Sequence, residues 1–195
     1  YGTNISGELL LNGKKLNLKN AKAAIKAGLA YVTEDRKGNG LILSNPIRVN
    51  TTLANMAGVC DKGVIDYDKE YAVAEDYRQK LRTKCPTVEQ NVGNLSGGNQ
   101  QKVQIAKWLF AEPKVLILDE PTRGIDVGAK YEIYCIINDL VAQGKSVVMI
   151  SSEMPELLGM SDRIYVMNEG KFVGEFMQEE ATQEKMMAAI LKSKT

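Results

Sequence analysis

Two adjacent carboxylates, Asp119 and Glu120, follow a short apolar run in the stretch VLILDEPTRGID. Such a run predicts a buried strand, and the Pro-Thr-Arg-Gly turn after it places both carboxylates at the strand's carboxyl end. Nucleotide hydrolases hold magnesium with one carboxylate of such a pair and act on water with the other. A bare Leu-Asp-Glu can also be an ordinary solvated turn, so this chemistry requires a phosphate-binding feature elsewhere in the chain.

A candidate for that feature is the stretch NLSGGNQQKVQIAKWLF, residues 94–110. Ser96 stands at the expected N-cap of a helix, and Gly97 and Gly98 follow it. The backbone N–H groups of a glycine-rich helix start point outward and the helix dipole adds positive potential, so this pattern predicts an anion site. The Ser96 hydroxyl would be one more donor. An ordinary capped helix is the alternative, and the Asp-Glu strand that follows favours the anion site.

Composition limits the classes of function. The 195 residues, 44% hydrophobic and 25% charged, predict one soluble globular domain, or one domain with a small insertion. Lys and Arg (25) balance Asp and Glu (24), which argues against a nucleic-acid partner. The absence of histidine excludes imidazole chemistry for this chain acting alone, and three scattered cysteines indicate a reducing compartment without a disulfide framework or metal site. No apolar run is long enough to span a membrane, and the first residues have no signal-peptide pattern.

The secondary structure that must position these residues differs between the two halves of the chain. The first half predicts a hairpin over 5–16, a helix over 21–27 between Asn20 and Gly28, a strand over 29–33, a polar loop over 34–40 and helical structure over 46–92, clearest at 66–83. The second half predicts helices at 97–111, 127–142 and 154–159, strands at 114–118, 146–151 and 163–167, a hairpin at 166–176 and a terminal helix at 181–192. The alternation in the second half indicates a parallel sheet covered by helices.

Together these motifs resemble the ATP-binding cassette (ABC) ATPases. Leu95–Gln100 is similar to their signature motif, Val115–Glu120 to their Walker B strand and Gly124–Asp126 to their D-loop. The resemblance implies ATP and magnesium as cofactors. It also implies that Asp119 holds magnesium through water and that Glu120 polarises the attacking water.

Longer stretches resemble the ATPase subunits of bacterial monosaccharide importers, in particular the second, carboxyl-terminal cassette of their two. They are AYVTEDRKGNGL, NLSGGNQQKV, DEPTRGIDVGAKYEIY and SSEMPELLGMSDRIYVMNEG. The resemblance implies an α/β fold of the ABC-type P-loop class. It divides the chain into a partial nucleotide-binding core with the hairpin and Q-loop region (1–45), a helical subdomain (46–96), and a core with the signature helix, Walker B, D-loop and switch region (97–195).

The phosphate loop of these proteins is Gly-x-x-x-x-Gly-Lys-Ser/Thr. Only Gly2 and Gly7 in GTNISGEL have the glycine spacing, and Glu8 and Leu9 follow where Lys and Ser or Thr would stand. An acidic side chain there would repel phosphate, and the glycines precede a predicted strand rather than a helix. We therefore expect these residues to lack a phosphate loop and the first strands, to be a piece of a longer protein, and to be inactive alone.

Two positions depart from most ABC cassettes. Glu34 aligns with the Q-loop glutamine, and Glu153 aligns with the switch histidine. A carboxylate beside a phosphate is unfavourable for stabilising the transition state, so turnover at this cassette's own Walker B is in doubt.

In ABC proteins two cassettes enclose ATP head to tail, so a signature motif completes the site of its partner. The resemblance thus implies that Ser96, Gly97, Gly98 and Gln100 contact the terminal phosphate of ATP held by the first cassette of the same chain or by a second copy. Asn99 takes the place usually given to glutamine, and its amide can still donate. Arg123 and Lys130 flank the D-loop containing Asp126, and we expect them to organise this interface.

The family's further partners are membrane permease subunits and, indirectly, a periplasmic or extracellular sugar-binding protein, which implies a peripheral location on the cytoplasmic face of a bacterial membrane. The loop 34–40 would lie near the permease, or be simply solvated. Two alternatives stay open: a non-catalytic regulatory cassette half, favoured by Glu34 and Glu153 but opposed by Glu120, and a soluble ABC ATPase not involved in transport.

Overall fold

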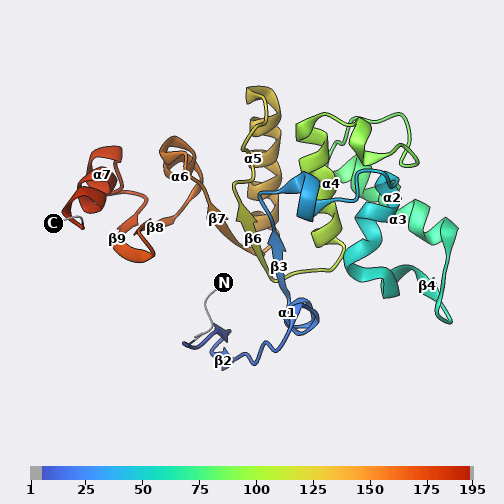
Figure 1. The fold of residues 1–195 in the computed structure, drawn as a ribbon, viewed down its shortest axis with the longest axis horizontal. Helices are drawn as coiled ribbons and strands as arrows, with labels where there is room; N and C mark the ends of the chain where they lie inside the picture. Colours follow the sequence, from blue (N-terminus) through green and yellow to red (C-terminus); the bar gives the residue numbers. More distant parts are fainter. Residues whose placement is uncertain (1–5, 194–195) are drawn as a thin grey trace.

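A three-stranded parallel sheet forms the centre of the computed structural model, which describes residues 6–193 (Figure 1). The strands lie in the order β3 (Leu29–Val32), β6 (Val115–Asp119) and β7 (Ser146–Ile150). In register, Leu118 lies between Val32 and Met149. Parallel neighbours need a crossover connection, which α5 (Val127–Ala142) supplies between β6 and β7. The α/β prediction is confirmed.

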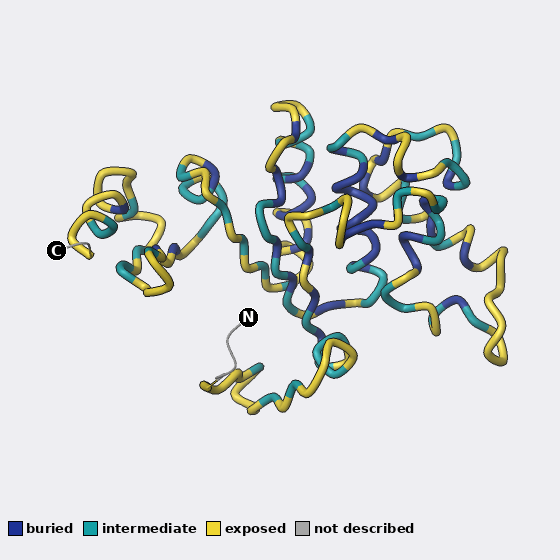
Figure 2. Tube along the Cα trace, in the orientation of Figure 1, coloured by how far each residue is buried: buried dark blue, intermediate teal, exposed yellow. Residues whose placement is uncertain are grey.

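The two faces of this sheet differ because side chains alternate along each strand. Val32 and Leu118 point into the main core, which the sheet shares with α4 (Gly97–Leu109) and α5. Tyr31 and Val148 point to the other face, where they remain 47% and 49% exposed. Figure 2 shows the buried residues concentrated where α4 and α5 meet the strands. The sheet therefore has one buried and one half-exposed face.

The segment 46–96 is helical only in part. It contains α2 (Ile47–Thr52), a 3₁₀ segment (Leu53–Val59), α3 (Tyr67–Lys80) and a 3₁₀ turn (Val92–Asn94). Between the helices lies a short hairpin of β4 (Cys60–Asp61) and β5 (Val64–Ile65), which corrects the expectation of helical structure across 46–92. Lys62 and Gly63 turn it with φ of 48° and 86°, as a tight two-residue hairpin requires.

The amino-terminal elements follow the sequence pattern closely. They are β1 (Leu10–Leu11), β2 (Lys14–Lys15) and α1 (Ala21–Ala27). The Asn20 side chain caps α1 by accepting from the Ala23 N–H, and Gly28 ends it with φ 92°. Gly7 precedes β1 rather than a helix. Gly2, the other glycine of the stretch GTNISGEL, lies outside the described residues.

The carboxyl-terminal elements are α6 (Met154–Met160), β8 (Arg163–Asn168), β9 (Lys171–Met177) and α7 (Gln183–Lys192). In Figure 1 the hairpin of β8 and β9 and the helix α7 stand apart from the central sheet, and α6 lies between them and β7. The strand predicted at 163–167 forms, but its expected membership of the parallel sheet is wrong, because β8 pairs antiparallel with β9 across the tight turn at Glu169 and Gly170. The hairpin packs with α7 around its own small core of Ile164, Val166 and Met186.

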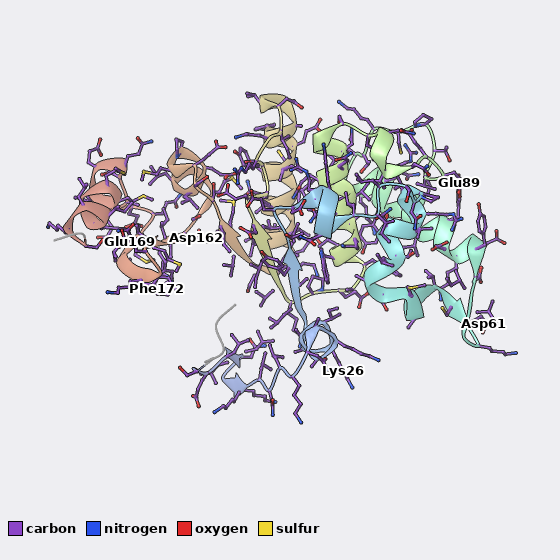
Figure 3. All side chains as sticks on the ribbon, viewed as in Figure 1. Lys26, Asp61, Glu89, Asp162, Glu169 and Phe172 are labelled. Carbon is purple, nitrogen blue, oxygen red and sulfur yellow. The ribbon has the colours of Figure 1, made fainter. Side chains whose placement is uncertain are left out.

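Figure 3 labels Phe172 in this hairpin and Asp61 in the β4–β5 hairpin near opposite ends of the molecule. Within residues 6–193, no helix combines the length and apolarity that crossing a bilayer would take. The candidate site residues belong to the middle of the molecule, on β6, the start of α4 and the segments beside them.

Candidate active site

Asp119 is the last residue of β6, and the Tyr31 hydroxyl donates to its Oδ2 across 2.5 Å. Tyr31 pairs in register with Ile117, two residues before Asp119, so both side chains lie on the same face of the sheet. The sequence analysis did not propose Tyr31. Tyr31 lies in the strand predicted at 29–33. It could have been proposed if that strand had been paired with the strand at 115–119. The bond fixes the orientation of the Asp119 carboxylate.

Glu120 has a backbone φ of 45°, in the left-handed region that residues with a Cβ seldom occupy. Its N–H donates to the Ile150 carbonyl at 2.8 Å, and its Oε1 accepts from the Ser152 N–H at 2.8 Å. The end of β7 thus holds both the main chain and the carboxylate of Glu120. Backbone strain of this kind clusters at functional sites, where the surrounding structure must overcome its cost.

Glu34 and Glu153, the predicted Q-loop and switch residues, each have a basic partner. Arg123 forms an ion pair with Glu34, and Lys130 Nζ lies 2.5 Å from Glu153 Oε1. The hydrogen bond to Glu153 raises the pKa of Lys130. Both basic residues belong to the segment that follows Glu120. This segment therefore contacts both carboxylates and neutralises their charges.

A third carboxylate, Glu156 on α6, is only 6% exposed. It accepts from the Thr122 hydroxyl at 2.8 Å and from the Ser151 hydroxyl. Burial, followed by the Glu156 charge, raises the pKa of the neighbouring Tyr134. Glu156 was not a candidate in the sequence analysis, where it lay within SSEMPE as one acidic residue of a short helix. Its two bonds tie the turn after Glu120 to the segment after β7.

Ser96 occupies the N-cap position of α4, as predicted, but its side chain makes no capping bond to the helix backbone. Its Oγ instead accepts from the Asn99 side-chain amide at 3.0 Å. The Gln100 side chain is buried, and its amide donates to the carbonyls of Val92 and Leu95 at 3.3 and 3.2 Å. In this structure that amide closes the turn before α4, and the predicted contact of Gln100 with a phosphate stays a prediction.

The two glycines of the signature have different surroundings. A Cβ on Gly98 would lie 2.6 Å from the Ala129 Cβ, so Gly98 lets α4 and α5 approach closely. A Cβ on Gly97 would meet only the Gly124 carbonyl at 3.5 Å and an Arg36 nitrogen at 3.8 Å. Close packing of the two helices therefore requires glycine at position 98. Gly97 lies in less crowded surroundings, beside the turn at Gly124.

Arg36 joins the segments around Gly97. Its Nη1 donates to the Arg123 carbonyl at 3.0 Å and to Gln101 Oε1 at 3.3 Å. Burial lowers the pKa of Arg36. The residue lies in a π-helical turn, Arg36–Gly40, where a polar loop was expected. Arg36 therefore brings the Q-loop region, the signature helix and the turn after Glu120 together, although the sequence placed it only near a possible permease contact.

The remaining D-loop candidate, Asp126, caps α5 by accepting from the Ala129 N–H at 3.0 Å. For magnesium, the donor chemistry of the strand end fits. Magnesium keeps most of its waters and needs one or two carboxylates together with substrate phosphates. Asp119 and Glu120 supply such carboxylates, and the described residues hold no cluster of three or more metal-ligating side chains that would form a complete protein cage.

Comparison with solved structures places the fold. A dimeric ATP-binding cassette bound to ADP and Pi aligns with a TM-score of 0.73 at 20% identity, covering 89% of this chain and 74% of that one. Another ATP-binding cassette of an ABC transporter aligns with a TM-score of 0.79 at 20% identity, covering 94% and 76%. These likenesses show an α/β fold of the kind seen in these cassettes. The chain belongs to the ABC transporter family, whose profile matches residues 2–123.

Curated relatives are more similar in sequence. The chain is 56% identical over 193 residues to the L-arabinose transport ATP-binding protein of Geobacillus stearothermophilus, covering 99% of this chain and 38% of that protein. It is 54% identical to the xylose import ATP-binding protein of Geobacillus kaustophilus and 55% identical to the ribose import ATP-binding protein of Oceanobacillus iheyensis, covering 93% of this chain and 36% of each. The chain thus spans well under half the length of these relatives.

Proposed function

We propose that this chain is the second nucleotide-binding domain of an ATPase subunit that couples ATP binding and hydrolysis to monosaccharide import. The observation that carries the proposal is the match to arabinose, xylose and ribose transport ATPases at 54–56% identity across 93–99% of the chain. The carboxylates of Asp119 and Glu120, held by Tyr31 and Ser152, support a catalytic strand end.

In this proposal Glu120 accepts a proton from the attacking water, and Asp119 holds magnesium through water. Magnesium, when bound with ATP, neutralises developing charge on the phosphates. Tyr31 fixes the orientation of Asp119, and the Ser152 N–H fixes that of Glu120. The ion pairs of Glu34 with Arg123 and of Glu153 with Lys130 reduce the repulsion that either carboxylate would exert on a phosphate.

The signature acts on the partner's nucleotide. Ser96, Gly97 and Gly98 at the start of α4 contact the terminal phosphate of ATP held by the first cassette or a second copy, and Asp126 belongs to the same interface. Residues 1–45 and 97–195 form the nucleotide-binding core and 46–96 the helical subdomain. The further partners are a membrane permease at the cytoplasmic face of the membrane and, indirectly, a sugar-binding protein, without nucleic acid.

Two other functions compete with this one. A non-catalytic regulatory cassette half would complete the partner's site without turning over ATP, and the carboxylates at positions 34 and 153 favour it. A soluble ABC ATPase outside transport would share the catalytic strand end. The names of the relatives favour transport.

Replacing Glu120 by Gln in the full-length ATPase tests the catalytic assignment. We expect turnover at this cassette's own site to fall by at least about 100-fold, since general-base catalysis contributes on that order, so kcat keeps only the partner cassette's share while unfolding by urea stays unchanged. An unaltered kcat would assign turnover to the partner cassette alone and favour the regulatory function. Calorimetric titration of residues 1–195 with magnesium-ATP should give no binding alone. Binding or hydrolysis should appear when the first cassette is added.

A further inference from the structure

Asn99 has a position in the signature that neither a direct phosphate contact nor a simple helix cap explains. Its Oδ1 accepts from the backbone N–H of Lys84 at 2.9 Å, and its Nδ2 donates to Ser96 Oγ at 3.0 Å. Both polar atoms of the Asn99 amide are therefore used inside the chain. The amide bridges the loop after α3 and the N-cap residue of α4.

The direction of the second bond is fixed by the first. A backbone N–H can only donate, so the atom that faces Lys84 must be the carbonyl oxygen of the Asn99 amide. The NH₂ group must then face Ser96, whose oxygen accepts. A serine hydroxyl has one proton, and an oxygen that accepts from a neighbour keeps this proton for a different partner. Ser96 is exposed, so that partner can come from outside the chain.

The hydrogen bonds of Asn99 are not needed to attach this loop to α4, because another side chain of α4 already does so. Lys102 on α4 donates to the Arg82 carbonyl at 2.9 Å and pairs with Glu132 on α5 at 2.7 Å. The loop at 82–84 is therefore attached to α4 without Asn99. The additional effect of Asn99 is that the Ser96 oxygen accepts a hydrogen bond, which leaves the Ser96 hydroxyl free to donate.

We propose that Asn99 is a positioning residue that holds Ser96 as a hydrogen-bond donor toward the anion bound at the start of α4. The inference rests on the proposed function, in which that anion is the terminal phosphate of the nucleotide held by the partner cassette. Phosphate oxygens near neutral pH mainly accept hydrogen bonds, so a serine fixed as donor suits them and a serine fixed as acceptor does not. Asn99 thus acts through Ser96 rather than by touching the phosphate.

The test is Asn99→Asp, which keeps the size of the side chain but reverses one bond. One carboxylate oxygen still accepts from the Lys84 N–H, while the other accepts from the Ser96 hydroxyl and removes its proton from the ligand side. An acidic residue in the first turn of a helix is favourable, so stability should hold. We expect KM for magnesium-ATP in the full-length ATPase to rise at least about tenfold, as for a lost hydrogen bond to a charged group, with the melting temperature unchanged.

Two further variants separate hydrogen-bond direction from charge. Asn94→Asp places the same charge at an exposed residue two positions before Ser96 and should change KM only slightly. Ser96→Ala removes the hydroxyl and should itself raise KM, and Asn99→Asp should then add only as much as Asn94→Asp does. An equal effect of Asn99→Asp with and without the Ser96 hydroxyl would overturn the inference, as would an unchanged KM in Ser96→Ala. If the wild-type ATPase shows no turnover at all, it is the proposed function that fails.

Discussion

The start of α4 and the edge formed by residues 119–126 both carry candidate site residues, yet they are held by different kinds of contact. Several polar side chains of α4 are buried: Gln100, in its first turn, donates to the Leu95 carbonyl at 3.2 Å, and further along Gln104 donates to the Thr33 carbonyl at 2.9 Å. At the other edge the ion pairs face water, with Arg123 65% exposed.

The difference has a physical consequence. A buried polar group that loses its partner pays its full desolvation cost, so the arrangement around α4 has little freedom. An exposed ion pair exchanges partners with water and salt at small cost. We infer that the buried contacts hold α4 in one arrangement, whereas Glu34 and Glu153 can exchange their partners for water and salt. The following predictions test this contrast, beginning with the largest expected effect.

The largest loss of stability should come from Glu132→Gln. Lys102 is 1% exposed, so its ammonium would stay buried without a negative counter-charge, with only neutral acceptors, the Arg82 carbonyl and the new amide oxygen, beside it. We expect the free energy of unfolding to fall by about 2–3 kcal/mol, in the range for charged hydrogen bonds. Lys102→Met should cost less, because Glu132 is 37% exposed and can reach water. Urea denaturation of both variants checks the order, and equal costs would contradict it.

The same pair gives a pH dependence. The bond from Lys102 lowers the pKa of Glu132 below its ordinary value of 4.5. A carboxyl group whose pKa is lower in the folded state contributes stability above its unfolded pKa and loses it as the pH falls through the folded value. Wild-type protein should therefore lose stability below about pH 4.5, and Glu132→Gln should lose less over the same interval. Parallel curves for the two proteins would contradict this.

These polar contacts mark the limit of what the sequence could predict. Local signals located Asn20 at the cap of α1, Gly28 at its end and Ser96 at the start of α4, because caps depend on neighbouring residues. The periodicity of α4 could not predict that Gln104 and Lys107 are buried, since their partners lie more than sixty residues away.

The sheet and the site show the same division. The strand at 163–168 formed as its composition predicted, but which strand it pairs with is a long-range choice that composition does not contain. Asp119 and Glu120 could be proposed from their motif. Tyr31 could be found only once β3 was known to lie beside β6.

An intermediate effect is expected at Thr122, which joins the exposed edge to a buried carboxylate. Thr122→Val removes the hydroxyl that donates to Glu156 Oε1, while the Ser151 hydroxyl still donates to Oε2. The loss should be about 1–2 kcal/mol, as for one buried hydrogen bond with some compensation. Thermal denaturation measures it, with Ser152→Ala as a control at an exposed neighbour whose bond to Glu120 comes from the backbone. A loss no larger than that of Ser152→Ala would place Thr122 with the exposed contacts.

The smallest effects should come from the ion pairs themselves. A double-mutant cycle of Lys130→Met and Glu153→Gln should give a coupling energy of about 0.2–1 kcal/mol. The cycle of Arg123→Met and Glu34→Gln should give less, because Arg123 is 65% exposed whereas Lys130 is 19% exposed. Both couplings should shrink as salt rises from low to physiological concentration, since exposed charges are screened. A coupling near 3 kcal/mol that salt does not alter would mean that this edge is as fixed as the start of α4, and the contrast between the two regions would fail.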